Sequence, residues 1–253
     1  MLKRIDATKP VRDLFIDFIE AIIIGEYDIA NILGELLEQS YNGLYNLKNV
    51  RNSYYTSEFE FGQFIVWEMC ICSTAILLHH KCYAELYALL NKTYFLKANH
   101  YDDGKISFNF THFRPSLSYI DTHINNTQLG DILSKRERCP ALTTHSIANA
   151  DVILYQLTDV FDIKNYFGYS WFPMLYKYLG NTRFGVVQEI WSKMVSKQHC
   201  ESLFPLFNVT TIDELISVIK NNVDVKRKIK YPLSFDCATI LNSISVEEIA
   251  KLP

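Results

Sequence analysis

Apolar residues near the start of the chain recur at spacings of three and four. Over residues 11–24 this pattern predicts an amphipathic helix with one buried stripe. The members of that stripe are Leu14, Phe15, Phe18, Ile19, Ile22 and Ile23. Over residues 27–44 the same spacing predicts a second helix. Its inward residues are Ile29, Ile32, Leu33, Leu36, Leu37 and Tyr41.

The longest apolar pattern covers residues 57–90 and predicts a single long helix that Ser57 would cap. Residues 65–78 within it are apolar on nearly every side. A helix with no polar face is usually buried on all sides. We therefore expect this helix at the centre of the fold.

The pattern changes between residues 93 and 146. Residues 93–98 and 105–110 are rich in aromatic and β-branched residues and flank a polar turn, which predicts one β-hairpin. Helical spacing then returns over 127–136, 147–161, 173–179, 182–203 and 211–219. Thr211 with Glu214, and Ser245 with Glu248, have the spacing of a capping box.

These elements predict a mainly α fold. We expect one multi-helix globular domain over residues 1–253, with about eight to ten helices and one small β-hairpin. The segment 93–146 is the one plausible seam or insertion. Glycine and proline are scarce, with 9 and 7 residues in 253, and this favours helices over a β-sandwich with many tight turns.

Composition and charge narrow the class of protein. A hydrophobic fraction of 49% and a charged fraction of 21% are typical of a folded globular chain. A net charge of −3 gives no basis for binding nucleic acid or a membrane surface through overall charge. Six irregularly spaced cysteines fit reduced thiols better than a disulfide framework. We expect a cytoplasmic protein with no membrane association.

Common catalytic and cofactor motifs are absent from the sequence. It contains no phosphate-binding loop, no dinucleotide-binding glycine pattern, no H-E-x-x-H and no G-x-S-x-G. The densest set of metal-ligand residue types is Cys70, Cys72, His79, His80 and Cys82. On a helix these side chains are spread too far in angle and height to surround one zinc ion. We therefore predict no metal and no cofactor.

One pair of residues suggests an enzyme. Arg138 and His145 are separated by six residues. This pair resembles the R-x4–6-H element of HEPN-type ribonucleases, which are helical and metal-independent. The resemblance implies a toxin-like or antiviral defence enzyme that acts on RNA. His145 would be the general acid or base, and Arg138 would stabilise charge on the phosphate.

A second candidate site is an aromatic cluster of Tyr166, Phe167, Tyr169, Trp171 and Phe172. Such residues anchor many protein interfaces, although they would equally fit a loop folded onto the core. Our leading prediction is a non-catalytic interaction or regulatory subunit of a larger intracellular assembly. It predicts a protein partner and leaves RNA and a second copy of the chain open as partners. The ribonuclease is the alternative.

Overall fold

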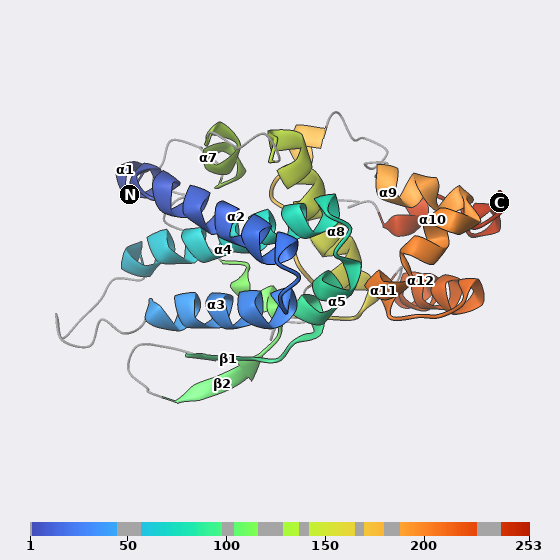
Figure 1. Ribbon diagram of the computed structural model, residues 1–253, viewed down its shortest axis with the longest axis horizontal. Coiled ribbons are helices and arrows are strands. Elements are labelled where there is room, and N and C mark those ends of the chain that lie inside the picture. The colour runs from blue at the N-terminus through green and yellow to red at the C-terminus, as the bar shows by residue number, and fades with distance from the viewer. Residues whose placement is uncertain are drawn as a thin grey trace.

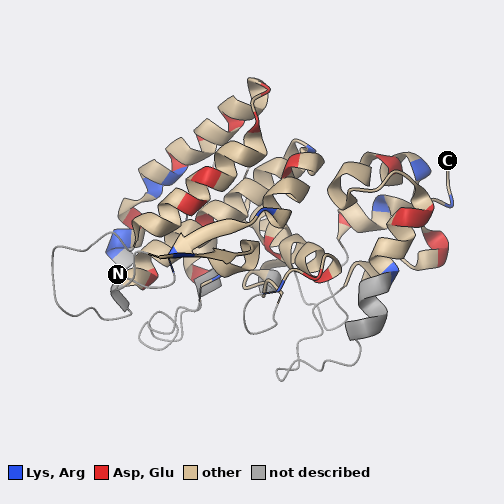
Figure 2. Cartoon of the chain, turned by 90° about the horizontal axis from the view of Figure 1, so that it is seen from below, with Lys and Arg blue, Asp and Glu red and all other residues tan. Residues whose placement is uncertain are grey.

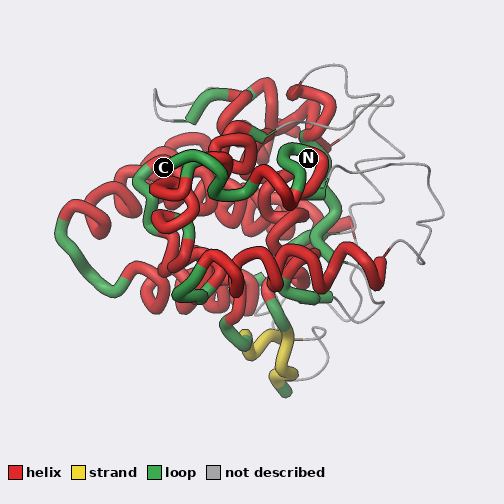
Figure 3. The backbone as a smooth tube through the Cα atoms, turned by 90° about the vertical axis from the view of Figure 1, so that its right-hand side faces the viewer, coloured by secondary structure: helices red, strands yellow, loops and turns green. Residues whose placement is uncertain are grey.

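The computed structural model describes residues 2–44, 57–97, 104–115, 129–136, 142–164, 170–179, 188–226 and 239–253. Within these ranges it contains eleven α-helices and a two-stranded antiparallel sheet (Figure 1). The prediction of a mainly α fold with one small β-hairpin is confirmed. The strands lie at the margin of the helical body (Figure 3).

The first half of the chain holds the longer helices. Their bounds are α1 Leu2–Ala7, α2 Lys9–Ile24, α3 Ile29–Gly43, α4 Ser57–His79 and α5 Tyr83–Asn91. The strands are β1 Tyr94–Lys97 and β2 Lys105–Phe108. The remaining helices are α7 Leu129–Lys135, α8 Thr144–Val160, α9 Glu189–Ser192, α10 Lys197–Ser202, α11 Phe204–Phe207 and α12 Ile212–Lys226.

Helix α4 lies at the centre of the fold, as its apolar sequence predicts. It packs against α1, α2, α3, α5 and α8. Phe64, Trp67 and Ile71 on this helix are fully buried. Because every side of α4 meets another element, its lack of a polar face is a consequence of its position.

Helix α4 also meets the length and composition of a membrane span over Phe59–His79, the one such helix in the described part of the chain. However, 72% of its most apolar window is buried inside the protein. The central helix of a folded domain has the same properties, so this observation is weak support for a membrane span.

The predicted single helix over 57–90 is wrong at its C-terminal end, because the chain turns between α4 and α5. Lys81 adopts a left-handed conformation with φ of 57°. The backbone N–H of Cys82 donates to the carbonyl of Leu77 at 2.9 Å, which closes the end of α4. The turn lets α5 pack against α3 and α11 instead of continuing along the axis of α4.

Polar side chains of α3 hold the hairpin in place. Asn42 donates through Nδ2 to the carbonyl of Phe95 at 3.0 Å, and its Oδ1 accepts from the Lys97 N–H at 2.8 Å. Glu38 Oε2 accepts from the Phe95 N–H at 2.9 Å. These bonds satisfy the outer backbone edge of β1. They therefore attach the hairpin to the helical body along α3.

The predicted helix over 182–203 is interrupted in the described residues 188–203. A 3₁₀ turn, Lys193–Val195, separates α9 from α10. Here the chain pairs with the C-terminal residues: the Lys197 N–H donates to the Leu252 carbonyl, and the Leu252 N–H donates to the Val195 carbonyl, both at 2.8 Å. This pairing uses backbone groups that a continuous helix would need for itself.

Other predicted helix ends have mixed outcomes. The capping box of Thr211 and Glu214 is confirmed, with both reciprocal bonds at 3.2 Å. Ser245 and Glu248 instead bond through their side chains at 3.3 Å, beside a single 3₁₀ turn. The predicted helix over 173–179 is likewise reduced to the 3₁₀ turn Tyr176–Leu179.

Candidate functional site

Helix α2 carries apolar residues on two adjacent faces, one buried and one exposed. Its buried apolar side consists of Phe15, Ile16, Ile19 and Ile22, none of them more than 8% exposed. Its outer side presents Val11, Leu14 and Phe18, which are 65%, 69% and 41% exposed. The predicted single buried stripe is therefore wrong for Leu14 and Phe18. Packing against α4 and α3 requires only one side of the helix.

The outer side of α2 concentrates the exposed apolar surface. Eight large apolar residues are exposed in the described part of the chain, and five of them lie on α2 or in the turn after it. Val11, Leu14 and Phe18 have the spacing of one helical face, and we call them the α2 stripe. At the C-terminal end, Ile24 and Tyr27 are 78% and 64% exposed, with Ile24 on the side of the helix that carries Asp17. Clustered exposure of this kind marks interaction surfaces.

One carboxylate, Asp17, borders the α2 stripe, and two more, Asp13 and Glu20, lie further around the helix on the same side. At 3.6 residues per turn, Asp17 lies about 60° and Asp13 about 100° around the axis from Leu14, on the side opposite to Val11. Glu20 follows about 120° from Leu14 on the same side. Asp17 is exposed, and the side chains of Asp13 and Glu20 are 53% and 29% exposed.

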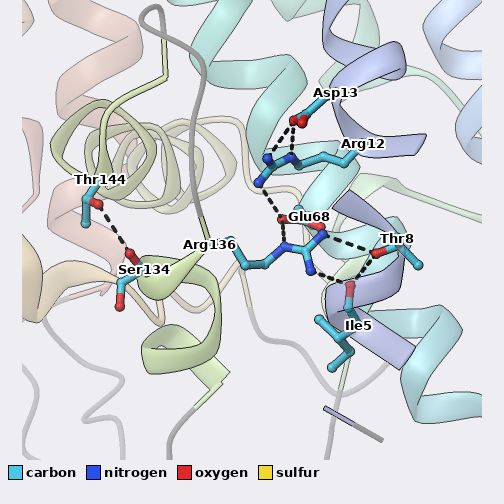
Figure 4. Close-up of polar contacts among 8 residues, drawn as sticks. All are labelled: Ile5, Thr8, Arg12, Asp13, Glu68, Ser134, Arg136 and Thr144. Carbon is cyan, nitrogen blue, oxygen red and sulfur yellow. Dashed lines mark hydrogen bonds and ion pairs between the residues drawn. The ribbon is translucent and has the colours of Figure 1, made fainter. Parts of the chain in front are cut away.

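A buried ionic cluster anchors α2 to the body of the protein (Figure 4). Arg136, at the end of α7, donates through Nε to Glu68 Oε1 at 2.7 Å and through Nη2 to Thr8 Oγ1 at 3.1 Å. It also donates through Nη1 to the Ile5 carbonyl. Arg136 and Glu68 have side chains only 1% exposed. One guanidinium therefore connects α7, α1 and α4.

Arg12 brings α2 into the same cluster. Its Nη1 lies 3.7 Å from Glu68 Oε1, and its Nε donates to Asp13 Oδ1 at 2.9 Å (Figure 4). The side chain of Arg12 is 3% exposed. Because buried charges are retained only with partners, this arrangement is a structural support for α2.

The proposed catalytic pair is described only in part. Arg138 lies in residues 137–141, outside the described residues. His145 is exposed in the first turn of α8, and its Nδ1 lies 3.3 Å from Asn149 Nδ2 on the same helix. The ribonuclease assignment stays a prediction.

The aromatic cluster is also described in part, because Tyr166, Phe167 and Tyr169 lie outside the described residues. Trp171 is fully buried and donates through Nε1 to Asp151 Oδ1 at 2.7 Å. Phe172 is half-buried, with the Arg114 guanidinium 5.2 Å from its ring centre. In this structure Trp171 is a core residue, and Phe172 is the described member that reaches the surface.

Asp151 fixes the segment that follows the aromatic cluster. Its Oδ2 accepts from the backbone N–H groups of Met174 and Leu175 at 2.6 and 2.8 Å. The side chain is fully buried, and burial raises the pKa of Asp151 to about 6 against the opposing effect of its hydrogen-bond donors. The role of Asp151 is to hold residues 171–175 against α8.

Two further histidines pair with side chains of other elements. His112 stacks on Phe108 and lies 2.9 Å from Tyr41 Oη, and burial lowers the pKa of His112 to about 4. His80 Nε2 pairs with Glu20 at 3.0 Å. Among the described residues, no three His, Cys, Asp or Glu side chains lie close enough together to hold a metal ion.

Comparison of the chain with protein-family models, with curated proteins and with solved structures finds no significant match. Function is therefore inferred from the residues themselves.

The sequence contains evidence for an exposed apolar row on α2, in addition to the buried one. Residues 11–24 contain more apolar positions than one side of a helix can hold. Two rows overlap there, one at 15, 19 and 22 and the other at 11, 14 and 18. Only the second row is available to a partner.

Proposed function

We propose that this protein is a non-catalytic interaction subunit of a larger assembly and that it binds a protein partner through the α2 stripe. The observation that carries this proposal is the concentration of exposed apolar residues on α2 and its following turn. A single exposed leucine is ordinary, whereas a row of three on one helical face is typical of a contact surface. Burial of a Val, Leu or Phe side chain contributes roughly 1.5–3 kcal/mol.

The support beneath the stripe favours the same role. Arg12 on the inner side of α2 is held near Glu68, and Glu68 is held by Arg136. A helix fixed in this way presents its outer side chains in one orientation. Binding then orders fewer groups, which increases the share of contact energy that appears as affinity.

The proposal is tested by purifying tagged protein under gentle conditions from its native source. Wild-type protein is compared with Leu14→Ser/Phe18→Ser, which makes the stripe polar. The control is Phe95→Ser/Ile106→Ser, because these hairpin residues are each 53% exposed. The hairpin packs on α3 and lies beyond it from α2 (Figure 1). Thermal unfolding of each variant, followed by circular dichroism, verifies the fold.

We expect a partner that binds wild-type and hairpin-variant protein at equal affinity in a purified two-component assay and binds the stripe variant at least tenfold more weakly. Recovery of the wild-type chain as a lone monomer would contradict the proposal. Equal binding by the stripe variant would contradict it as well.

A further inference from the structure

We propose that the partner presents an amphipathic helix with lysine or arginine residues along one edge of its apolar face. This inference rests on the proposed function, because it concerns the same α2 stripe. It adds the chemistry of the partner, which follows from the charges beside the stripe. Helices that dock on apolar faces are matched by anchors at spacings of three, four and seven.

The length of the α2 stripe matches a short stretch of a second helix. Val11 and Phe18 are seven residues apart, or about 10 Å along the axis at 1.5 Å per residue. Gly25 ends α2, and Tyr27 follows it with 64% exposure. The apolar surface is therefore long and narrow, and it fits two to three turns of a second helix packed against it.

The side of α2 next to the stripe is acidic, and few basic side chains of α2 lie near it. Asp13, Asp17 and Glu20 all lie on the same side of Leu14. The two basic residues of α2 are Lys9, which is half-buried, and Arg12, which is 4% exposed. Neither offers an exposed counter-charge beside the stripe.

The three carboxylates differ in their availability. Asp13 already accepts two bonds from Arg12, and Glu20 is paired with His80. Asp17 lies between them along the helix and is exposed. We therefore assign Asp17 the largest share of the charge recognition.

Two of the helices that pack against α2 have no basic residues, whereas α1 carries exposed Lys3 and Arg4 beside Asp6. Helices α3 and α4 contain no lysine or arginine within their bounds. Red acidic segments recur along the helices of this half of the molecule in Figure 2. A partner with a basic edge would meet favourable potential there, and one with an acidic edge would be repelled.

A second copy of this chain fits the surface less well. If two α2 helices packed antiparallel about a two-fold axis, their acidic edges would lie on the same side of the contact and repel each other. If they packed in parallel, each acidic edge would face the opposite edge of the other stripe, where α2 has no lysine or arginine. The charge pattern therefore favours a different chain.

The probe is a pair of designed helical peptides of about 20 residues, a length at which an isolated helix can form. Both carry leucines at spacings of three and four, and one has lysines along one edge where the other has glutamates. Binding to wild-type protein is measured by fluorescence anisotropy. The variants are Asp17→Lys, Leu14→Ser/Phe18→Ser and the control Glu247→Lys. Glu247 is an exposed acid near the C terminus, which lies at the end of the molecule opposite the N terminus (Figure 1).

We expect the lysine peptide to bind more tightly than the glutamate peptide. Asp17→Lys should weaken binding of the lysine peptide about three- to tenfold, as exposed charge pairs allow. Glu247→Lys should leave it unchanged, and the stripe variant should lose it. At an ionic strength of about 1 M, where the Debye length is roughly 3 Å, the preference between the peptides should disappear.

The outcomes separate the inference from the proposed function. If both peptides bind equally and both depend on Leu14 and Phe18, the basic edge is wrong and the contact surface stands. If Glu247→Lys weakens binding as much as Asp17→Lys, the charge effect is not local and the inference fails. If neither peptide binds, the inference is overturned, and the co-purification experiment still decides the function.

Discussion

Arg136, at the end of α7, connects separate elements of the fold. Its guanidinium bonds to Glu68 on α4, to Thr8 and to the Ile5 carbonyl. We expect Arg136→Met to lower the free energy of unfolding by roughly 3–5 kcal/mol, because Glu68 would keep its buried charge and lose its closest partner. Urea denaturation followed by circular dichroism measures this change.

The control for Arg136 is an ion pair at the surface. Lys193 Nζ pairs with Glu189 at 2.5 Å, and their side chains are 59% and 78% exposed. Solvent screens such a pair, so Lys193→Met should leave stability nearly unchanged. If both variants lost the same free energy of unfolding, the buried cluster would contribute no more to stability than a surface ion pair.

Asp151 predicts a dependence of stability on pH. Its pKa is about 6 in the folded protein and near its ordinary value of 3.8 in the unfolded chain. The folded state therefore holds the proton more tightly, and this contribution is complete below about pH 4 and is lost as the pH rises through about 6. The slope can reach about 1.4 kcal/mol per pH unit.

The measurement compares wild-type protein with Asp151→Asn, which cannot titrate at this position. The difference in free energy of unfolding, wild-type minus variant, should fall between about pH 4 and pH 6 and level off above. Urea titrations at half-unit steps of pH would resolve it. A difference that stays flat, or that rises with pH, would contradict the raised pKa.

His145 decides between the two functions predicted from the sequence. Its ring is exposed and lies beside Asn149 on its own helix. A general acid or base needs hydrogen-bond reach to the reacting proton, so the position alone does not define an active site. We expect neither wild-type protein nor His145→Ala to cleave RNA. Cleavage by wild-type protein that disappears in His145→Ala would support the ribonuclease.

At the scale of the element, the sequence predicts the helices and strands best where the periodic pattern runs without a break. Helix α8 and the hairpin lie where the pattern predicts them. The break at Lys81 had no such signal, since the left-handed residue there is not a glycine. The break near Ser196 arises from pairing with Leu252, far along the chain.

The candidate site was less predictable than the fold. Periodicity identifies apolar rows and does not say which row packs inward when a helix has two. The positions of α3 and α4 decide that choice for α2. Trp171 illustrates the converse, since an aromatic residue in a loop segment is fully buried because Asp151 accepts its indole N–H.

The two sides of α2 predict opposite mutational effects. Ile19 is fully buried, so Ile19→Ala should lower the free energy of unfolding by roughly 2–5 kcal/mol. Leu14 is 69% exposed, so Leu14→Ala should change it by no more than about 0.5 kcal/mol. Thermal and urea unfolding compare the two variants. A large loss in Leu14→Ala would mean that Leu14 is part of the core.

At the scale of the whole molecule, α4 connects the parts of the fold. It contacts the N-terminal helices α1, α2 and α3, and it also contacts α8. Helix α8 in turn contacts α12, and α5 contacts α11. Elements before and after the 93–146 segment therefore lie against each other. If residues 1–253 form one domain, these contacts should be lost in a single cooperative step when the protein unfolds.

Amide hydrogen exchange tests this arrangement on protein purified without detergent. We expect the amides of α4 and α8 to exchange most slowly and with the same free energy of opening, because each is buried along its length and they pack on each other. The hairpin should exchange faster, since β2 has exposed Lys105 and Ile106. Mass spectrometry after timed labelling resolves these segments. If α8 opened well before α4, the chain would unfold in two units and the single domain would be wrong. If α4 exchanged quickly in water, it could not be the central helix of a folded domain.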